Sequence, residues 1–245
     1  MSMDHAREAL RRARAWLFDF DGTLTDYHVA DAQALSSLRE KHFAAVPAEE
    51  FTVRAHRART AYYGLARAAG PGAGPEAGAR AGLDDFRVGS LLEQEGRAGD
   101  PAVVSHYQAA LRQATVAAPG AEALLGALAS RLPVAVVSNA YDVEPQRSRV
   151  VATGLQSLLS DVLIAAEVGH FKPDPTLLLI AAERLGVPPS ACVYVGDSVD
   201  FDVVAATAAG MTSVLVAEQG SPEADVHVTS LRALHDLVRG LGITD

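Results

Sequence analysis

The sequence has very little of several features, and each scarcity excludes a class of protein. Its 245 residues include one cysteine, Cys192, which rules out an internal disulfide framework and a zinc site built on several cysteines. No apolar run approaches the roughly 18–20 residues that cross a bilayer, and Met1–Arg14 lacks the apolar segment of a signal peptide. We therefore expect a cytoplasmic protein with no membrane partner, in which Cys192 is a small buried apolar residue.

Lysine is also scarce. Lys41 and Lys172 are the two lysines among 21 basic residues, and 30 acidic residues give a formal net charge of −9. A negative field of this size argues against a general nucleic-acid binder, so we expect no nucleic-acid partner. With 49% hydrophobic and 21% charged residues, the chain is not disordered, and its length suits one large domain or a core with a smaller insert.

The second half of the chain alternates between short Val-rich runs and helical patterns. The short runs are typical of strands buried on both faces of a sheet. Predicted strands cover 15–20, 133–138, 162–165, 191–195 and 212–216. Predicted helices cover 121–132, 175–185 and 203–209, and 1–14 reads as an amphipathic helix. The pattern predicts an α/β fold with a parallel sheet and helices on both of its faces.

The stretch from 25 to 115 interrupts this alternation. It contains no convincing strand and is rich in Ala, Arg, Leu and Glu, so we interpret it as an all-helical insert. The remaining segments, 1–24 and 116–245, then form the α/β core. Within the insert, 69–82 is rich in Gly, Pro and Ala and is expected to be a flexible connection. No preceding strand supports the alternative, a nucleotide-binding loop.

Two carboxylates end the first predicted strand, in the run Asp19-Phe20-Asp21-Gly22-Thr23. Asp19 and Asp21 are two residues apart and start on the same side of the chain, and Gly22 permits a tight departure from the strand. Ligands of α/β folds bind at the carboxyl ends of parallel strands. Two carboxylates this close repel each other unless a cation or a proton neutralises them. The alternative is an ordinary strand followed by an Asp-Gly turn.

Three further groups of polar residues lie in the second half of the chain. Ser138 and Asn139 end a strand and offer a hydroxyl and backbone N–H groups to an anion. Lys172 precedes a proline and is therefore held extended. Another strand ends in three acids, Asp197, Asp200 and Asp202. Oxygen ligands in such a cluster favour a hard divalent cation, Mg²⁺ before Zn²⁺. Each motif alone has an ordinary explanation: turn formers, a surface lysine or a helix cap.

Together and in this order, the four motifs resemble those of the haloacid dehalogenase (HAD) superfamily of phosphohydrolases. They correspond to Asp19–Asp26, Ser138, Lys172 and Gly196-Asp197-Ser198 with Asp202. The resemblance implies a Rossmann-like, doubly wound parallel core over 1–24 and 116–245, with a C1-type helical cap over 25–115. The sequence departs from the pattern at Phe201, where many relatives have Asn, and we expect Phe201 to pack rather than bind.

The resemblance also implies roles for the motif residues. Asp19 would be the nucleophile that forms an aspartyl-phosphate, while Asp21 would protonate the leaving oxygen and later activate water. Ser138 and Lys172 would hold the transferring phosphoryl group. Asp202 would hold Lys172 or a metal-bound water. The expected cofactor is Mg²⁺, held by the set Asp19, Asp21, Asp197 and Asp202.

The second acid distinguishes reaction classes within the family. Dehalogenases lack it because halide leaves without a proton, so Asp21 predicts a phosphatase acting on a small phosphorylated metabolite. A phosphoryl-transfer mutase of the β-phosphoglucomutase type keeps both acids and stays open. A 2-haloacid dehalogenase and a catalytically silent binding module are more remote alternatives. The sequence leaves open a monomer or a homodimer and does not name the ester.

Substrate contacts are expected beside the first motif and in the insert. A cap of this size should close over the site and favour a small organophosphate. The basic, aromatic stretch 54–63 suits an anionic or polyhydroxylated leaving group, with a solvated helix face as the alternative. The predicted substrate-binding residues are Gly22, Thr23, Asn139, Tyr27, His28, Arg54 and Arg57. No ligand spacing joins the histidines that we expect to be structural, which are His106, His227 and His235.

Overall fold

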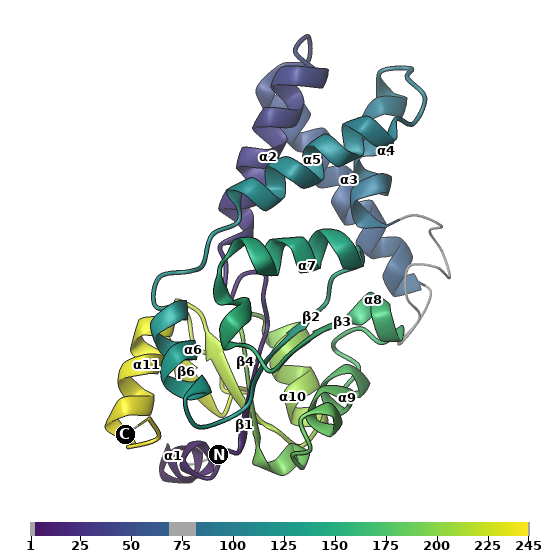
Figure 1. The fold of residues 1–245 in the computed structure, drawn as a ribbon. Coiled ribbons are helices and arrows are strands. Elements are labelled where there is room, and N and C mark those ends of the chain that lie inside the picture. The colour runs from purple at the N-terminus through teal and green to yellow at the C-terminus, as the bar shows by residue number, and fades with distance from the viewer. Residues whose placement is uncertain (1–2, 69–81, 245) are drawn as a thin grey trace.

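A parallel sheet forms the centre of the lower part of the molecule in this computed structural model, which describes residues 3–68 and 82–244 (Figure 1). Its strands lie in the order β3-β2-β1-β4-β5-β6, and each neighbouring pair is parallel. In chain order they are β1 (Ala15–Phe18), β2 (Val134–Ser138), β3 (Asp161–Ile164), β4 (Cys192–Gly196), β5 (Thr212–Val216) and β6 (Val226–Val228). This order is that of the doubly wound fold, as predicted.

Helices cover both faces of the sheet (Figure 1). One face packs against α1 (Met3–Arg11), α6 (Ala121–Ala129), α7 (Val143–Ala152), the short η2 (Leu155–Leu158) and α11 (Leu231–Gly240). The other face packs against α8 (Ala165–Val168), α9 (Thr176–Arg184), η3 (Pro189–Ala191) and α10 (Val204–Ala208). Both faces are therefore closed to water, which explains the continuous apolar character of the strands.

The central strand shows how one short sequence supplies both cores. Trp16 and Phe18 point into the cluster that contains α6 and α11, whereas Ala15 and Leu17 point into the cluster that contains α9 and α10. All four are fully buried, because successive side chains of a strand alternate between its faces. Cys192 is buried in β4 as expected, and burial raises the pKa of its thiol to about 11.

The inserted helices form a separate bundle above the sheet (Figure 1). They are α2 (Tyr27–His42), α3 (Ala48–Ala68), α4 (Leu83–Gln94) and α5 (Pro101–Ala114), and their apolar faces make a third core. Two chain segments join the bundle to the sheet side by side, since the Ala118 N–H donates to the Leu24 carbonyl at 2.7 Å and Thr25 bridges Ala117. The exact domain bounds stay a prediction, and the loop expected over 69–82 falls, except for Gly82, outside the described residues.

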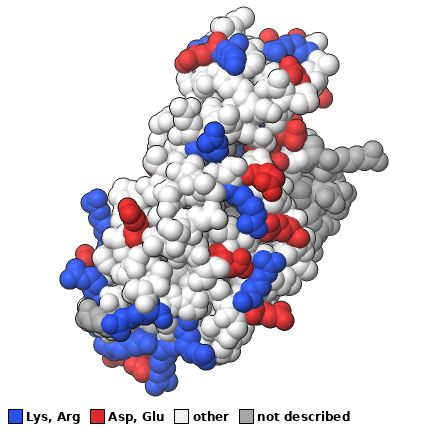
Figure 2. Space-filling model, in the orientation of Figure 1, with Lys and Arg blue, Asp and Glu red and all other residues white. Residues whose placement is uncertain are grey.

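Several elements of the core were not predicted, among them the strand β6 and the helices α7, α8 and α11. The β6 strand has three residues, with an exposed His227 between two buried valines, and is too short for alternation to stand out. Strand β1 also ends at Phe18, earlier than the expected 15–20, because the chain turns at the first motif. None of the described helices is long and apolar enough to cross a membrane. Acidic and basic side chains are interspersed over the face in Figure 2, with basic ones gathered at the α1 end.

A buried ion pair ties the helical bundle together. Arg87 of α4 donates to both carboxylate oxygens of Asp31 on α2, at 2.7 and 3.1 Å, and the Tyr107 hydroxyl of α5 donates to the same carboxylate at 2.6 Å. Burial alone would raise the pKa of Asp31, but the hydrogen bonds and charge of Arg87 outweigh burial and lower it. Three helices are thus joined through one carboxylate that depends on its partners.

We expect Arg87→Met to destabilise the protein by about 3–5 kcal/mol at pH 7, because it leaves the Asp31 charge buried without its cation. Since the pKa of Asp31 is lowered by folding, its contribution is complete above the ordinary value of 3.8 and is lost as the pH falls through the folded value. The difference in melting temperature from wild type should therefore shrink at pH 3. Arg112→Met, at an exposed position of α5, is the control. Equal, small effects of both changes would contradict the account.

Candidate active site

Polar side chains meet where β1 and β4 end. Asp19 follows β1 directly and Asp197 follows β4, and these two strands are neighbours in the sheet. The chain winds outward from β1 to β2 and β3 on one side, then crosses back to β4 on the other. The carboxyl ends of β1 and β4 therefore flank the point where the strand order reverses, which is the usual ligand site of this fold.

The first motif bends sharply beside Asp197. Gly22 has a φ of +96°, which favours glycine, and a Cβ at this position would collide with the Asp197 carboxylate. The Thr23 hydroxyl donates to Asp197 Oδ1 at 3.2 Å. The structure thus brings the predicted residues Gly22 and Thr23 against Asp197, where they fix the position of this carboxylate.

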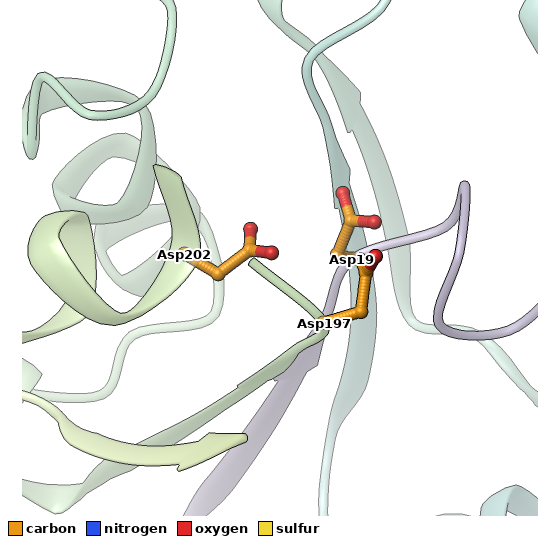
Figure 3. A group of neighbouring side chains, drawn as sticks. All are labelled: Asp19, Asp197 and Asp202. Atoms are coloured by element: carbon orange, nitrogen blue, oxygen red, sulfur yellow. The ribbon is translucent and has the colours of Figure 1, made fainter. Parts of the chain in front are cut away.

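Asp202 reaches the site from an unusual turn. It lies in a π-helical turn, η4 (Val199–Val203), a geometry that frequently occurs at functional sites. Its carboxylate points across toward Asp19 and Asp197 (Figure 3). The Ser198 N–H donates to its Oδ2 at 3.0 Å, and Lys172 donates to its Oδ1 at 2.7 Å. Both oxygens therefore have donors, which favours Asp202 as the holder of Lys172 over a direct metal ligand.

Lys172 is the cation of this cluster. It is 3% exposed, and its ammonium donates to Asp19 Oδ1 at 2.6 Å, to Asp202 and to the Tyr194 hydroxyl at 2.7 Å. All three ammonium protons are thereby used. Burial would lower the pKa of Lys172, but the charges of Asp19 and Asp202 outweigh burial and raise it well above its usual value.

The carboxylates outnumber this cation. Burial raises the pKa of Asp19 well above its ordinary value, the charge of Lys172 opposes the rise, and the charges of Asp202 and Asp197 add to it. Burial and Asp202 also raise the pKa of Asp197. One oxygen from each of the three carboxylates lies within 4.8 Å of the others. An excess of negative charge on converging oxygens fits a hard divalent cation, and Asp19 with Asp197 are the residues best placed to hold it.

A cavity of about 940 Å³ opens between the sheet edge and the helical bundle. Asp19, Asp21, Ser138, Lys172 and Asp197 line its floor. Asn139 also lines the cavity, but its side chain is engaged with the backbone of Lys172, accepting from its N–H at 2.7 Å and donating to its carbonyl at 2.9 Å. Asn139 therefore positions Lys172, in addition to any substrate contact.

The cavity wall opposite the floor comes from the inserted helices. Tyr27 and His28 line it, as the sequence analysis expected. Arg54 does not: it lies on the outer side of the bundle, paired with Glu50 and Glu95. Arg57 is exposed and also lies outside the lining.

Other residues take the places expected for these two arginines. Arg59 and Tyr63 of the same helix line the cavity instead. Phe201, expected to pack, is 36% exposed at the cavity wall.

Asp21 is held by helix α7. Arg149 donates to both of its oxygens, at 2.5 Å to Oδ1 and 3.1 Å to Oδ2, and Gln146 donates to Oδ2 at 2.9 Å. Gln146 also donates to the Ser138 hydroxyl at 3.0 Å. The Asp21 side chain remains 27% exposed on its cavity side. Asp21 thus stands apart from the cluster around Lys172, with a cation of its own.

The sequence profile of the haloacid dehalogenase-like hydrolases matches residues 13–210. The chain belongs to this family. Its HAD-like fold is shared by L-2-haloacid dehalogenase from Xanthobacter autotrophicus, with a TM-score of 0.69 at 21% identity over 93% of this chain and 99% of that one.

Curated relatives of this HAD-like hydrolase are named as phosphatases. Phosphoglycolate phosphatase from Rhodospirillum rubrum is 32% identical over 90% of this chain and 85% of its own. Glyceraldehyde 3-phosphate phosphatase from Methanopyrus kandleri is 39% identical, but over 29% of this chain and 30% of the relative, so that match spans less than a third of either protein. These relatives support a phosphoric monoester hydrolase.

Sequence reasoning missed several residues of the HAD-like site. Tyr194 looked like one more apolar position of a strand, yet its hydroxyl contacts Lys172 and Asp202. Gln146 and Arg149, which the sequence analysis did not consider, lie one helical turn apart, and both are 3% exposed. Their spacing of three residues places both side chains on one face of a helix that follows Ser138. A single sequence does not distinguish such a buried pair from two surface residues.

We expect Lys172→Met to destabilise the metal-free protein by about 3–5 kcal/mol, because it leaves buried carboxylates without their cation. Asp19→Asn should cost nothing and raise the melting temperature at pH 7. The raised pKa of Asp19 means that its charged form is disfavoured by folding, so wild-type stability falls as the pH rises from 3.8 toward the folded value. Thermal melts in EDTA measure both variants. A loss in Asp19→Asn as large as that in Lys172→Met would contradict this balance of charges.

Proposed function

We propose that the protein is a Mg²⁺-dependent phosphatase that hydrolyses a small phosphate monoester through an aspartyl-phosphate at Asp19. The observation that carries this proposal is the pairing of two acids with different surroundings. Asp19 is 6% exposed and bonded to Lys172, whereas Asp21 is held separately by Arg149 and faces the cavity. Two carboxylates in distinct environments suit a nucleophile and a proton carrier, respectively.

The nucleophile would be the second oxygen of Asp19. Lys172 bonds to Oδ1, and among the described residues none donates a hydrogen bond to Oδ2. Oδ2 would attack phosphorus while the bond from phosphorus to the leaving oxygen breaks. Ser138 would hold a phosphoryl oxygen, and the positive charge of Lys172, which lines the same floor, would stabilise the negative charge that the phosphoryl oxygens carry.

Asp21 would carry the proton through both halves of the reaction. In the first half it gives a proton to the leaving oxygen, and in the second it takes one from the water that attacks the aspartyl-phosphate. Mg²⁺ held by Asp19 and Asp197 would neutralise charge on the phosphoryl oxygens. The presence of Asp21 favours an ester over a halide, because a departing alkoxide needs a proton and a halide does not.

The proposal is tested by a phosphate-release screen over small esters that includes 4-nitrophenyl phosphate. We expect release that EDTA abolishes and Mg²⁺ restores, with weak activity in Ca²⁺, which prefers more ligands and looser geometry. Asp19→Asn should lower turnover by several orders of magnitude without loss of folding. Full activity in metal-free buffer, or more than about a tenth of wild-type turnover in Asp19→Asn, would contradict the mechanism. An isomerised sugar phosphate instead of free phosphate would indicate the mutase.

We further propose that the leaving group carries a carboxylate that Arg59 binds. Arg59 lines the cavity and lies 3.8 Å from Asp31, a carboxylate that already accepts two hydrogen bonds from Arg87 and one from Tyr107. Because Arg87 and Tyr107 already occupy the Asp31 oxygens, the Arg59 guanidinium keeps donors for a ligand in the cavity. The name of the Rhodospirillum rubrum relative, a phosphoglycolate phosphatase, is consistent with an anionic leaving group.

Tyr63 links Arg59 to the part of the cavity that Asp21 faces. Burial raises the pKa of the Tyr63 hydroxyl, with the charge of Arg59 opposing the rise and that of Asp21 adding to it. Tyr63, Arg59 and Asp21 also line the same cavity. Since Asp21 would act on the leaving oxygen, we place the atoms attached to that oxygen on the side of the cavity that Tyr63 and Arg59 line.

Arg59→Gln should lower kcat/KM for phosphoglycolate by about ten- to a hundred-fold, equivalent to about 1.4–2.8 kcal/mol, because a charged hydrogen bond is lost. Hydrolysis of 4-nitrophenyl phosphate should barely change, since its leaving group has no carboxylate. Arg112→Gln, exposed on α5, is the matched control and should change neither substrate. Equal losses on both substrates would instead assign Arg59 to the stability of the helical bundle.

A further inference from the structure

Helix α7 carries two buried polar residues that the reaction described above does not use. Gln146 and Arg149 are three residues apart, so they lie on one face of the helix, and each is 3% exposed. Both are directed at Asp21. Burying a guanidinium and an amide costs free energy unless each is fully bonded, so the partners of these two side chains define what they do.

The hydrogen bonds fix the Gln146 amide in one orientation. Its oxygen accepts from Arg149 at 2.8 Å, and its nitrogen donates to Asp21 Oδ2 at 2.9 Å and to the Ser138 hydroxyl at 3.0 Å. A guanidinium can only donate and a carboxylate can only accept, so the reversed amide would face a donor with a donor. Gln146 therefore joins the proton carrier to Ser138 with a defined geometry.

Arg149 is anchored on its other edge. Its Nε donates to the Thr115 hydroxyl at 3.0 Å, and that hydroxyl donates to the Leu111 carbonyl at 2.7 Å. The guanidinium also lies over the rings of Phe20 and Tyr27, with its carbon 5.5 and 5.2 Å from their centres. Phe20 precedes Asp21, and Thr115 lies on the segment that returns from the bundle to the sheet. The Arg149 guanidinium that binds Asp21 is thus fixed by contacts on its opposite edge and on its ring-facing side.

These contacts leave one position open on the Asp21 carboxylate. Each carboxylate oxygen can accept about two hydrogen bonds. Oδ2 accepts from both Arg149 and Gln146, whereas Oδ1 accepts from Arg149 alone among the described residues. Because the side chain is partly exposed toward the cavity, Oδ1 is the oxygen with a lone pair available to a proton.

We propose that Gln146 and Arg149 are positioning residues that aim Asp21 Oδ1 at the leaving-group oxygen. The inference rests on the proposed phosphatase function. Asp19 Oδ2 bonds to phosphorus, the P–O bond to the leaving group breaks with its electron pair going to that oxygen, and the proton on Asp21 Oδ1 passes to it. In the second half, water bonds to phosphorus, the bond from Asp19 to phosphorus breaks, and the proton of the water returns to Oδ1.

A comparison of leaving groups separates this role from a structural one. Glycerol 2-phosphate releases an alkoxide that must be protonated, whereas 4-nitrophenyl phosphate releases a stable anion. Arg149→Met and Gln146→Met should each lower kcat/KM for glycerol 2-phosphate by about ten- to a hundred-fold, a fraction of what general acid catalysis supplies. For 4-nitrophenyl phosphate, kcat/KM should stay within about threefold of wild type. Equal losses on the two esters, or no loss on either, would overturn the inference.

The controls keep the outcomes distinct. Arg147→Met lies on the same helix, where Arg147 pairs with Glu167 away from Asp21, and should leave both rates unchanged. Asp21→Asn should show the largest difference in kcat/KM loss between glycerol 2-phosphate and 4-nitrophenyl phosphate. Adding Arg149→Met to Asp21→Asn should lower kcat/KM little further, since both changes remove the same function. Fully additive losses would overturn the inference.

Two further outcomes separate a folding defect from the proposed role and the proposed role from the proposed function. If Arg149→Met fails to fold, Gln146→Met, close in size to the side chain that it replaces, decides alone. Wild-type protein inactive on both esters would overturn the proposed function itself, whereas active protein without discrimination would overturn only the positioning role.

Discussion

The site depends on a single buried ammonium. Lys172 bonds to two carboxylates and one hydroxyl, and without it the nearly buried Asp19 and Asp202 would repel each other as like charges. Much of the surrounding structure serves to hold this group. Asn139 fixes its backbone, and Tyr194, from the strand between β1 and β5, fixes its ammonium.

This arrangement separates the two acids of the first motif although only one residue, Phe20, lies between them in sequence. The strand and the turn at Gly22 send Asp19 toward Lys172 and Asp21 toward helix α7. Each acid then has its own cation and its own surroundings. A nucleophile and a proton carrier require that difference, so the geometry of one tight turn supplies the chemical asymmetry of the site.

The core of the fold and its motif residues were predictable because their signals are local. Continuous Val-rich runs mark strands buried on two faces, and acids at strand ends mark the sheet edge where ligands bind. Asp19, Lys172 and Asp197 were therefore found from sequence, and the structure brings them together. Helical patterns likewise identified α1, α6, α9 and α10 beside the sheet, whereas α7, α8 and α11 were not predicted.

The cap wall was less predictable, because it depends on which face of a long helix turns inward. Arg54, Arg57 and Arg59 lie within six residues of α3, and the basic character of the stretch does not reveal that Arg59 alone among them lines the cavity. Gln146 and Arg149 were missed for a similar reason. Their partner Asp21 is more than 120 residues away in sequence, and a buried polar pair on a helix resembles a solvated one until its partner is placed.

The central claim is that phosphate leaves the substrate by transfer to Asp19. The most direct measurement is to quench the enzyme with acid during turnover of 4-nitrophenyl phosphate and to map the phosphorylated peptide by mass spectrometry. The account predicts one phosphoryl group on the Asp19 carboxylate, with none in Asp19→Asn. A phosphoryl group on another residue, or turnover that proceeds with no phosphorylated enzyme under these conditions, would contradict it.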